Sequence, residues 1–133
     1  MKCLVITLAA MALCLSLAAA PLAAKGAPDL TGTWEGTMSY VEWVNGNNNY
    51  FNSPGAMIVT NIDLATGNFY GTFDGYSMTG NVSTKKIITG VIYFGSGEYG
   101  TFDAKVTGPK ISGVLNGFAS GNIWTVKFDL VKQ

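Results

Sequence analysis

The sequence of 133 residues contains no histidine and no arginine, and its two cysteines, Cys3 and Cys14, lie close to the N-terminus. The rest of the chain therefore lacks imidazole bases, thiol nucleophiles and the soft ligands of transition metals. Its carboxylates are scattered, without a recognisable pair spacing or a calcium-loop pattern. We expect no enzymatic activity, no catalytic residues, no metal site and no cofactor.

Charge is also scarce, because Asp, Glu, Lys and Arg together make up 12% of the chain and balance to a formal charge of zero. Proteins that bind nucleic acid usually present arginine forks or a basic patch to the phosphates, and this chain has neither. Nucleic acid is therefore not an expected partner.

The N-terminal 24 residues have the features of a secretory signal peptide. Lys2 is followed by an apolar run over residues 4–17 and a small-residue stretch over 18–24. This run is shorter than the ~20 residues that a membrane-spanning helix needs, so we expect cleavage after Ala24 or Gly26 rather than an anchor. Cleavage at Ala24 removes both cysteines and leaves 109 of 133 residues, with seven lysines against eight acidic residues. The sequence thus predicts a periplasmic or secreted protein, not inserted in a membrane after cleavage.

The remaining chain alternates apolar and polar residues with the period of two that is typical of half-buried strands. Residues 25–30 form a short leader before a single domain over 31–133. The expected strands are 31–44, 56–62, 68–74, 77–83, 87–94, 98–107, 110–119 and 122–131. Residues 45–55 are expected to be an irregular insertion, with one turn at Asn45-Gly46 and a second at Pro54-Gly55.

No window shows helical periodicity of useful length, and 17 glycines argue further against helices. Eight short strands joined by tight turns favour antiparallel neighbours, and closing such a sheet removes both unpaired edges. The predicted fold is all-β, an eight-stranded antiparallel up-and-down (meander) barrel. A flat or sandwiched sheet is the alternative.

Glycines recur on the face of the strands that is expected to point inward. Two interpretations stay open at this point: glycine allows the tight bending of a small barrel whose aromatic side chains fill the space, or it leaves room for a ligand that those side chains hold. The inward glycines are Gly36, Gly71, Gly80, Gly90, Gly100 and Gly113, beside Trp34, Phe73, Val82, Phe102, Leu115 and Trp124.

Three segments carry a family resemblance: Thr31-Gly32-Thr33-Trp34, residues 57–60 (MIVT) and residues 66–73 (TGNFYGTF). They resemble the first three strands of the avidin and streptavidin family, and Gly32-x-Trp34 is similar to the signature of the wider calycin superfamily. The resemblance implies a calycin-like barrel with a small molecule in its lumen. Glu35-Gly36-Thr37-Met38-Ser39 stands where avidins place the biotin-binding Asn and Ser. Of these only Ser39 or Thr37 could serve, and their spacing does not match, so biotin is not the expected ligand. Lipocalins stack an Arg on the signature Trp, for which this chain offers only Lys127 or Lys132.

We therefore expect a barrel that binds a small apolar or amphipathic molecule in its lumen. Trp34 and Trp124 are expected to close one end of the barrel as core packing, with a role as ligand wall as the alternative. A carbohydrate-binding module, which would use the aromatic and amide groups of the loop after residue 42, is one alternative. A protein-interaction or inhibitor module using residues 25–30 or the barrel edge is another, and homo-oligomerisation is left open. The candidate lumen residues are Trp34, Met38, Phe73, Tyr99, Phe102 and Trp124, and the alternative surface residues are Trp43, Asn47, Asn49, Tyr50 and Phe51.

Overall fold

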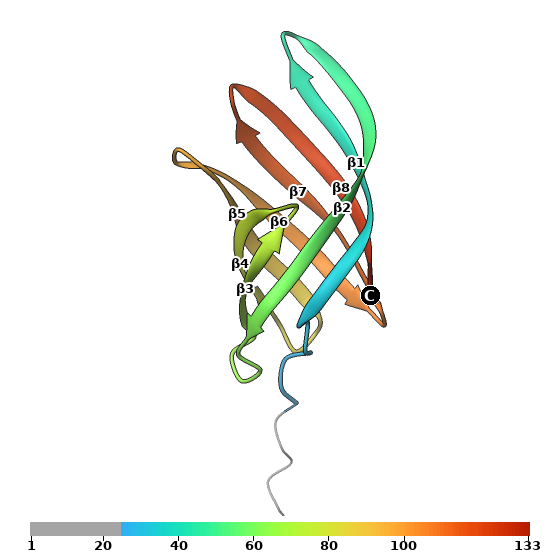
Figure 1. The fold of residues 1–133 in the computed structure, drawn as a ribbon, viewed down its shortest axis with the longest axis vertical. Helices are drawn as coiled ribbons and strands as arrows, with labels where there is room; N and C mark the ends of the chain where they lie inside the picture. Colours follow the sequence, from blue (N-terminus) through green and yellow to red (C-terminus); the bar gives the residue numbers. More distant parts are fainter. Residues whose placement is uncertain (1–24) are drawn as a thin grey trace, which may run out of the picture.

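Eight antiparallel strands form one closed sheet in the computed structural model, which describes residues 25–133 (Figure 1). Each strand pairs with its neighbours in the chain, and β1 pairs with β8 from Trp34 to Trp43. The predicted meander barrel is thereby confirmed and the flat or sandwiched sheet is excluded. The predicted signal peptide lies outside the described residues. The strands are β1 (Gly32–Val44), β2 (Asn47–Ile62), β3 (Asn68–Phe73), β4 (Tyr76–Val82), β5 (Ile87–Gly95), β6 (Glu98–Thr107), β7 (Lys110–Ala119) and β8 (Asn122–Lys132).

The interior of the barrel is filled by side chains in its lower and middle parts. The rings of Phe73, Phe102 and Phe128 meet at its centre, with centroids 5.1 to 6.5 Å apart. The rings of Phe69 and Phe102 lie against Gly80 and Gly90, where an added Cβ would overlap them. No polar or charged side chain is buried among the described residues. Gly80 and Gly90 thus make room for neighbouring rings, as the packing interpretation predicted.

The lower end of the barrel is closed by the leader. Leu30 is fully buried, and its carbonyl accepts a hydrogen bond of 2.8 Å from Trp34 Nε1. The Ala27 N–H donates to the Leu64 carbonyl at 3.0 Å, which fixes the leader against the β2–β3 turn. Lys132 Nζ lies 5.4 Å from the centre of the Trp34 ring, within cation–π range.

The second strand departs from the prediction, because residues 47–62 form one continuous strand instead of an irregular insertion followed by a short strand. Only the Asn45-Gly46 turn is confirmed, with φ of 49° and 82°. No turn forms at Pro54-Gly55, which pair with Thr37 and Gly36 of β1. Because β3 pairs with β2 only from Met57 onward, Pro54 lies where β2 has a single neighbouring strand.

The alternation of hydrogen-bonded and non-hydrogen-bonded residue pairs along the β1–β2 hairpin explains why Pro54 is tolerated. A two-residue turn is flanked by a pair that exchanges both backbone hydrogen bonds, here Val44 and Asn47, and such pairs then alternate along the hairpin. The N–H groups of even-numbered residues in this part of β2 therefore face away from β1. The Ala56 carbonyl fits this alternation, since it accepts a hydrogen bond from the Asp74 N–H. Proline at position 54 removes no bond to β1.

The same alternation predicts that proline has a large effect at one exposed asparagine of β2 and a small effect at another. Asn49→Pro should remove a bond to Glu42 and lower the amide-exchange protection of the β1–β2 hairpin about tenfold or more, because a buried ladder bond is lost. Asn52→Pro should change protection by less than about threefold, since its N–H faces away from β1. Amide hydrogen exchange of Tyr40 and Glu42, whose N–H groups face β2, measures both. An equal loss of exchange protection in the two variants would contradict the assigned hydrogen-bonding pattern.

Candidate functional site

The wall of the barrel is of unequal height at its upper end. The β3–β4 hairpin turns at Asp74-Gly75, whereas the β1–β2, β5–β6 and β7–β8 hairpins extend further (Figure 1). Above the end of β3 the barrel interior is therefore open on one side. This opening leaves a cavity of about 300 Å³, which we call the mouth cup. It is lined by Tyr40, Glu42, Phe51, Phe73, Asp74, Tyr76, Ile92, Phe94, Leu115, Ala119 and Trp124.

The floor of the mouth cup is the top of the packed core. Phe73, Ile92 and Leu115 are each at most 4% exposed and belong to the buried cluster below. Because they point inward from β3, β5 and β7, three different strands fix the floor. A ligand in the cup would therefore rest on a rigid apolar base.

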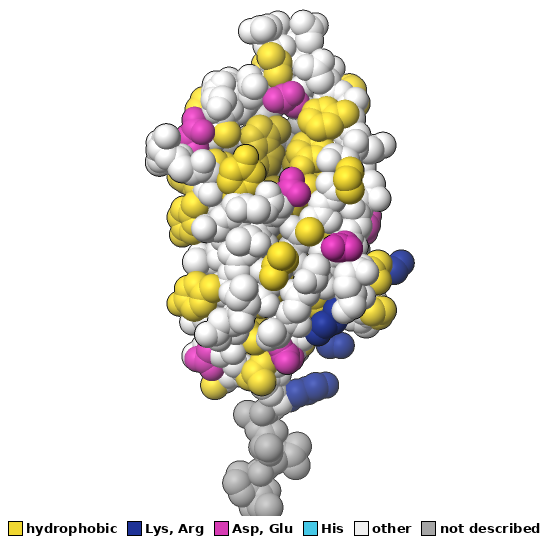
Figure 2. All heavy atoms as spheres, in the orientation of Figure 1, with side chains coloured by type: hydrophobic (Ala, Val, Ile, Leu, Met, Phe, Trp, Pro, Cys, Tyr) yellow, Lys and Arg dark blue, Asp and Glu magenta, His cyan; other side chains and the backbone are white. Residues whose placement is uncertain are grey.

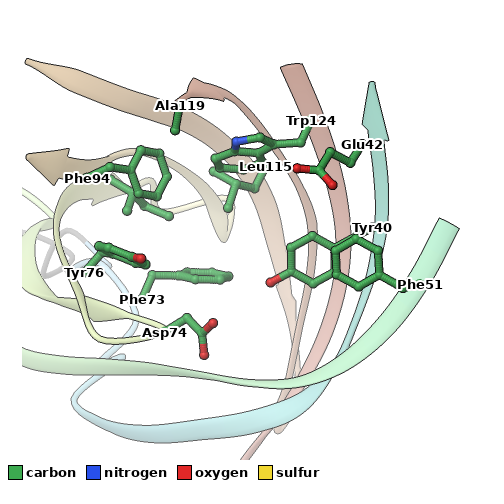
Figure 3. Close-up of a pocket in the computed structure, with 11 residues that line it drawn as sticks. Tyr40, Glu42, Phe51, Phe73, Asp74, Tyr76, Phe94, Leu115, Ala119 and Trp124 are labelled. Carbon is green, nitrogen blue, oxygen red and sulfur yellow. The ribbon is translucent and has the colours of Figure 1, made fainter. Parts of the chain in front are cut away.

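Two aromatic walls rise from this floor (Figure 3). On one side Tyr40 and Phe51 stack in parallel, with centroids 4.6 Å apart and 6° between the ring planes. On the other side Phe94 meets Tyr76 and Trp124 edge to face, at 5.0 and 5.1 Å. The cup thus offers flat apolar faces from opposite sides.

The polar groups of the cup include two carboxylates, which come from different elements. Glu42 extends from β1, and its Oε1 accepts a hydrogen bond of 3.2 Å from Asn122 Nδ2. Asp74 occupies the β3–β4 turn, where its own N–H is bonded to Ala56. Burial raises the pKa of the Tyr40 phenol above its ordinary value, and the charges of Asp74 and Tyr76 add to this shift. Tyr40 is therefore a neutral hydroxyl at physiological pH, and it donates a weak hydrogen bond of 3.7 Å to Met38 Sδ.

The candidate lumen residues do not form one site. Phe73 and Trp124 line the mouth cup, whereas Trp34, Met38 and Phe102 are buried in the packed barrel below it. Trp34 and Trp124 lie at opposite ends, since Trp34 pairs with Lys132 and Trp124 pairs with Glu42. They do not close one end together.

Tyr99 lies outside the barrel. It is 59% exposed and pairs with Tyr93 on the outer face of β5 and β6. The inward positions of β6 are Gly100, Phe102 and Ala104, so a residue one position before Gly100 must point outward. A lumen position for Tyr99 is therefore wrong.

The alternative surface residues are divided between the two faces of the β1–β2 hairpin. Residues paired across two strands share a face, so Trp43 lies with Asn48, and Tyr50 lies with Val41, on the outer face. Asn47, Asn49 and Phe51 pair with inward-facing residues of β1, and Phe51 lines the mouth cup. Trp43 and Tyr50 remain together as an exposed aromatic pair, 49% and 73% exposed.

Several cup residues were not among the candidates drawn from the sequence. Trp34 and Met38 point inward by the alternation along β1. Tyr40 and Glu42 follow Met38 by two and four residues, so the same alternation could have identified them. Alternation along a strand could not identify Asp74, because this residue lies in a turn with φ of 50°. The other missed residues are Tyr76, Ile92, Phe94, Leu115 and Ala119.

Further searches of residues 25–133 add two negative findings. No group of three metal-ligating side chains is present there. No helix in that part of the chain is long and apolar enough to cross a membrane.

Comparison of the chain with protein-family models, with curated proteins and with solved structures finds no match in any of the three.

Proposed function

We propose that the mature protein is an exported, non-enzymatic barrel that binds a small amphipathic molecule in the mouth cup. The observation that carries the proposal is the cup itself, an apolar cavity of about 300 Å³ with a few polar groups at one place, which is the usual form of a small-molecule site. Export rests on the sequence of residues 1–24.

The packing of the barrel supports the mouth rather than the deep lumen as the binding place. Neighbouring side chains take the space over several inward glycines, including Met38 over Gly55 and Phe128 over Gly113. A ligand there would have to displace core residues, whereas the cup is open to solvent. We therefore keep the small-molecule binding inferred from the calycin-like sequence at residues 31–34 and place it in the mouth cup instead of the deep lumen.

A substitution that fills the cup tests this proposal. Ala119 is half-buried at the end of β7 and lines the cup (Figure 3), so the indole of Ala119→Trp should fill much of the cavity. Ligand affinity should fall at least about tenfold, through steric exclusion. The matched control is Phe118→Trp, which places the same indole one residue away on the outer face, where Phe118 is 55% exposed.

Native mass spectrometry provides the measurement, on protein purified gently from the exported fraction of its own host. Wild type and Phe118→Trp should carry an added mass that is lost on denaturation, and Ala119→Trp should be bare. Wild type that stays bare after incubation with lipid and metabolite extracts would contradict the proposal. So would an added mass retained by Ala119→Trp.

The carbohydrate-binding alternative keeps one specific observation in its favour. Trp43 and Tyr50 are exposed on the same outer face of the β1–β2 hairpin, with Asn48 and Asn52 beside them. Sugar rings stack on such aromatic faces and hydrogen-bond to such amides. The leader is a weaker candidate for protein interaction, because Leu30 is fully buried as the plug of the barrel.

A further inference from the structure

The mouth cup combines aromatic faces with negative charge and contains no basic group. Glu42 and Asp74 are its two ionisable carboxylates, and none of the described residues that line it is a lysine. Only Glu42 has a side-chain hydrogen bond to a neighbour, from the neutral amide of Asn122. Among the residues that the structure describes, no cation lines the cup to balance this charge.

None of the lysines among residues 25–133 lines the cup, although Lys127 lies beside Tyr40 and Phe51 in a neighbouring groove. Lys132 lies over Trp34 at the closed lower end. Figure 2 shows acidic side chains around the apolar hollow near the upper end and also at the lower end, while the basic side chains visible in that view lie toward the lower end. Glu42 and Asp74 give the mouth a negative charge that favours a cationic ligand and opposes an anionic one.

The aromatic walls of the cup also favour a cationic ligand. The face of an aromatic ring carries the negative part of its quadrupole, and an ammonium group within about 6 Å of a ring centre is attracted to it. Tyr40 and Phe51 present stacked rings on one side of the cup, and Trp124, the ring type that binds cations best, stands on the other (Figure 3). Several such faces around one small cavity form a cage for an alkylated ammonium group.

From these observations we infer that the ligand of the mouth cup carries a positively charged amine or quaternary ammonium group attached to an apolar body. The inference rests on the proposed function and specifies its ligand class. The apolar body packs on Phe73, Ile92 and Leu115, and the ammonium group lies among the ring faces near Glu42 and Asp74. Fatty acids and other anionic amphiphiles are excluded by the same charges.

Three probes with the same eight-carbon tail test the inference: octyltrimethylammonium, 1-octanol and octanoate, each titrated by calorimetry below its micelle concentration. Octyltrimethylammonium should bind at least about tenfold more tightly than 1-octanol, because cation–π and ionic attraction add to burial of the tail. Octanoate should bind more weakly than 1-octanol.

The double variant Glu42→Gln/Asp74→Asn removes the two charges with little change of shape, and asparagine tolerates the positive φ at position 74. Its preference for the cation should fall to about threefold or less, and its affinity for 1-octanol should stay within about twofold. Asp103→Asn, which removes one charge from the exposed outer face of β6, should keep the wild-type preference.

The outcomes separate this inference from the proposed function. Equal binding of the cationic and neutral probes, or tighter binding of octanoate, would overturn the inference and leave the cup as a binding site. A preference unchanged in the double variant would also overturn it. Failure of all three probes to bind the wild type would contradict the proposed function and this inference together.

Discussion

Phe128→Ala is expected to lower the free energy of unfolding by about 3–5 kcal/mol, the usual cost of removing a buried ring from a close-packed core. Phe128 is 1% exposed, and its ring lies edge to face against Phe73 with centroids 5.1 Å apart. Deleting it would leave a void at the centre of the barrel. Urea unfolding of the mature protein measures the change.

The matched control for this truncation is Phe118→Ala, which removes the same ring from the outer face. Phe118 is 55% exposed, so its loss should change the free energy of unfolding by less than about 1 kcal/mol. A loss below about 1 kcal/mol for Phe128→Ala would mean that the middle of the barrel is not packed. A packed core would then no longer confine the ligand to the mouth cup.

Gly71→Ala is expected to cost about 3 kcal/mol although it adds a single methyl group. An added Cβ at Gly71 would overlap the backbone carbonyl of Ile58, and one at Gly36 would overlap that of Asp129. Backbone atoms in a paired strand cannot move aside as a side chain can, so the strands would have to separate. These two glycines therefore set how closely β3 approaches β2 and β1 approaches β8.

Gly100→Ala is the control, because Gly100 is also inward and paired but has more room. Its added Cβ would lie 3.0 Å from the Asn116 carbonyl oxygen and 3.2 Å from Leu115 Cδ1. The cost should stay within about 1 kcal/mol, since alanine also reduces the entropy of the unfolded chain. Thermal and urea unfolding of both variants compare them. Equal stability of Gly71→Ala and Gly100→Ala would contradict the assigned strand spacing.

The strands could be predicted from the sequence because they follow from local signals, and closure could be predicted separately because it removes both unpaired edges of the sheet. Alternation with period two along Trp124, Val126 and Phe128 fixes which face is buried, and glycine-containing turns fix the antiparallel order. The Asn45-Gly46 turn is of the same kind. None of these signals depends on which strands meet in space.

The extent of β2 could not be predicted in that way. Pro54-Gly55 is a normal turn signal, and it is overruled here because β3 begins to pair with β2 only at Met57. That register is a property of the folded sheet. The lumen prediction for Tyr99 was wrong for a different reason. Strict alternation from Phe102 already places Tyr99 on the outer face, so the sequence alone could have given its correct position.

The mouth cup depends on the relative heights of four hairpins, which no short window of sequence records. Its lining comes from residues far apart in the chain, including Tyr40 on β1, Asp74 in a turn and Trp124 on β8. Phe73 and Trp124 could be predicted as inward aromatics. That they border a cavity follows only from the short β3–β4 hairpin beside its longer neighbours.

The most direct test of the account is the location of a neutral apolar probe, 1-octanol, by intermolecular nuclear Overhauser effects on the labelled mature protein. Contacts should appear at Ile92, Phe94 and Trp124 in the mouth cup, and not at Phe69 or Ile111 in the packed barrel below. Contacts confined to the packed barrel, contacts only on the exposed outer face of the β1–β2 hairpin, or none at all would contradict the mouth cup as the binding site.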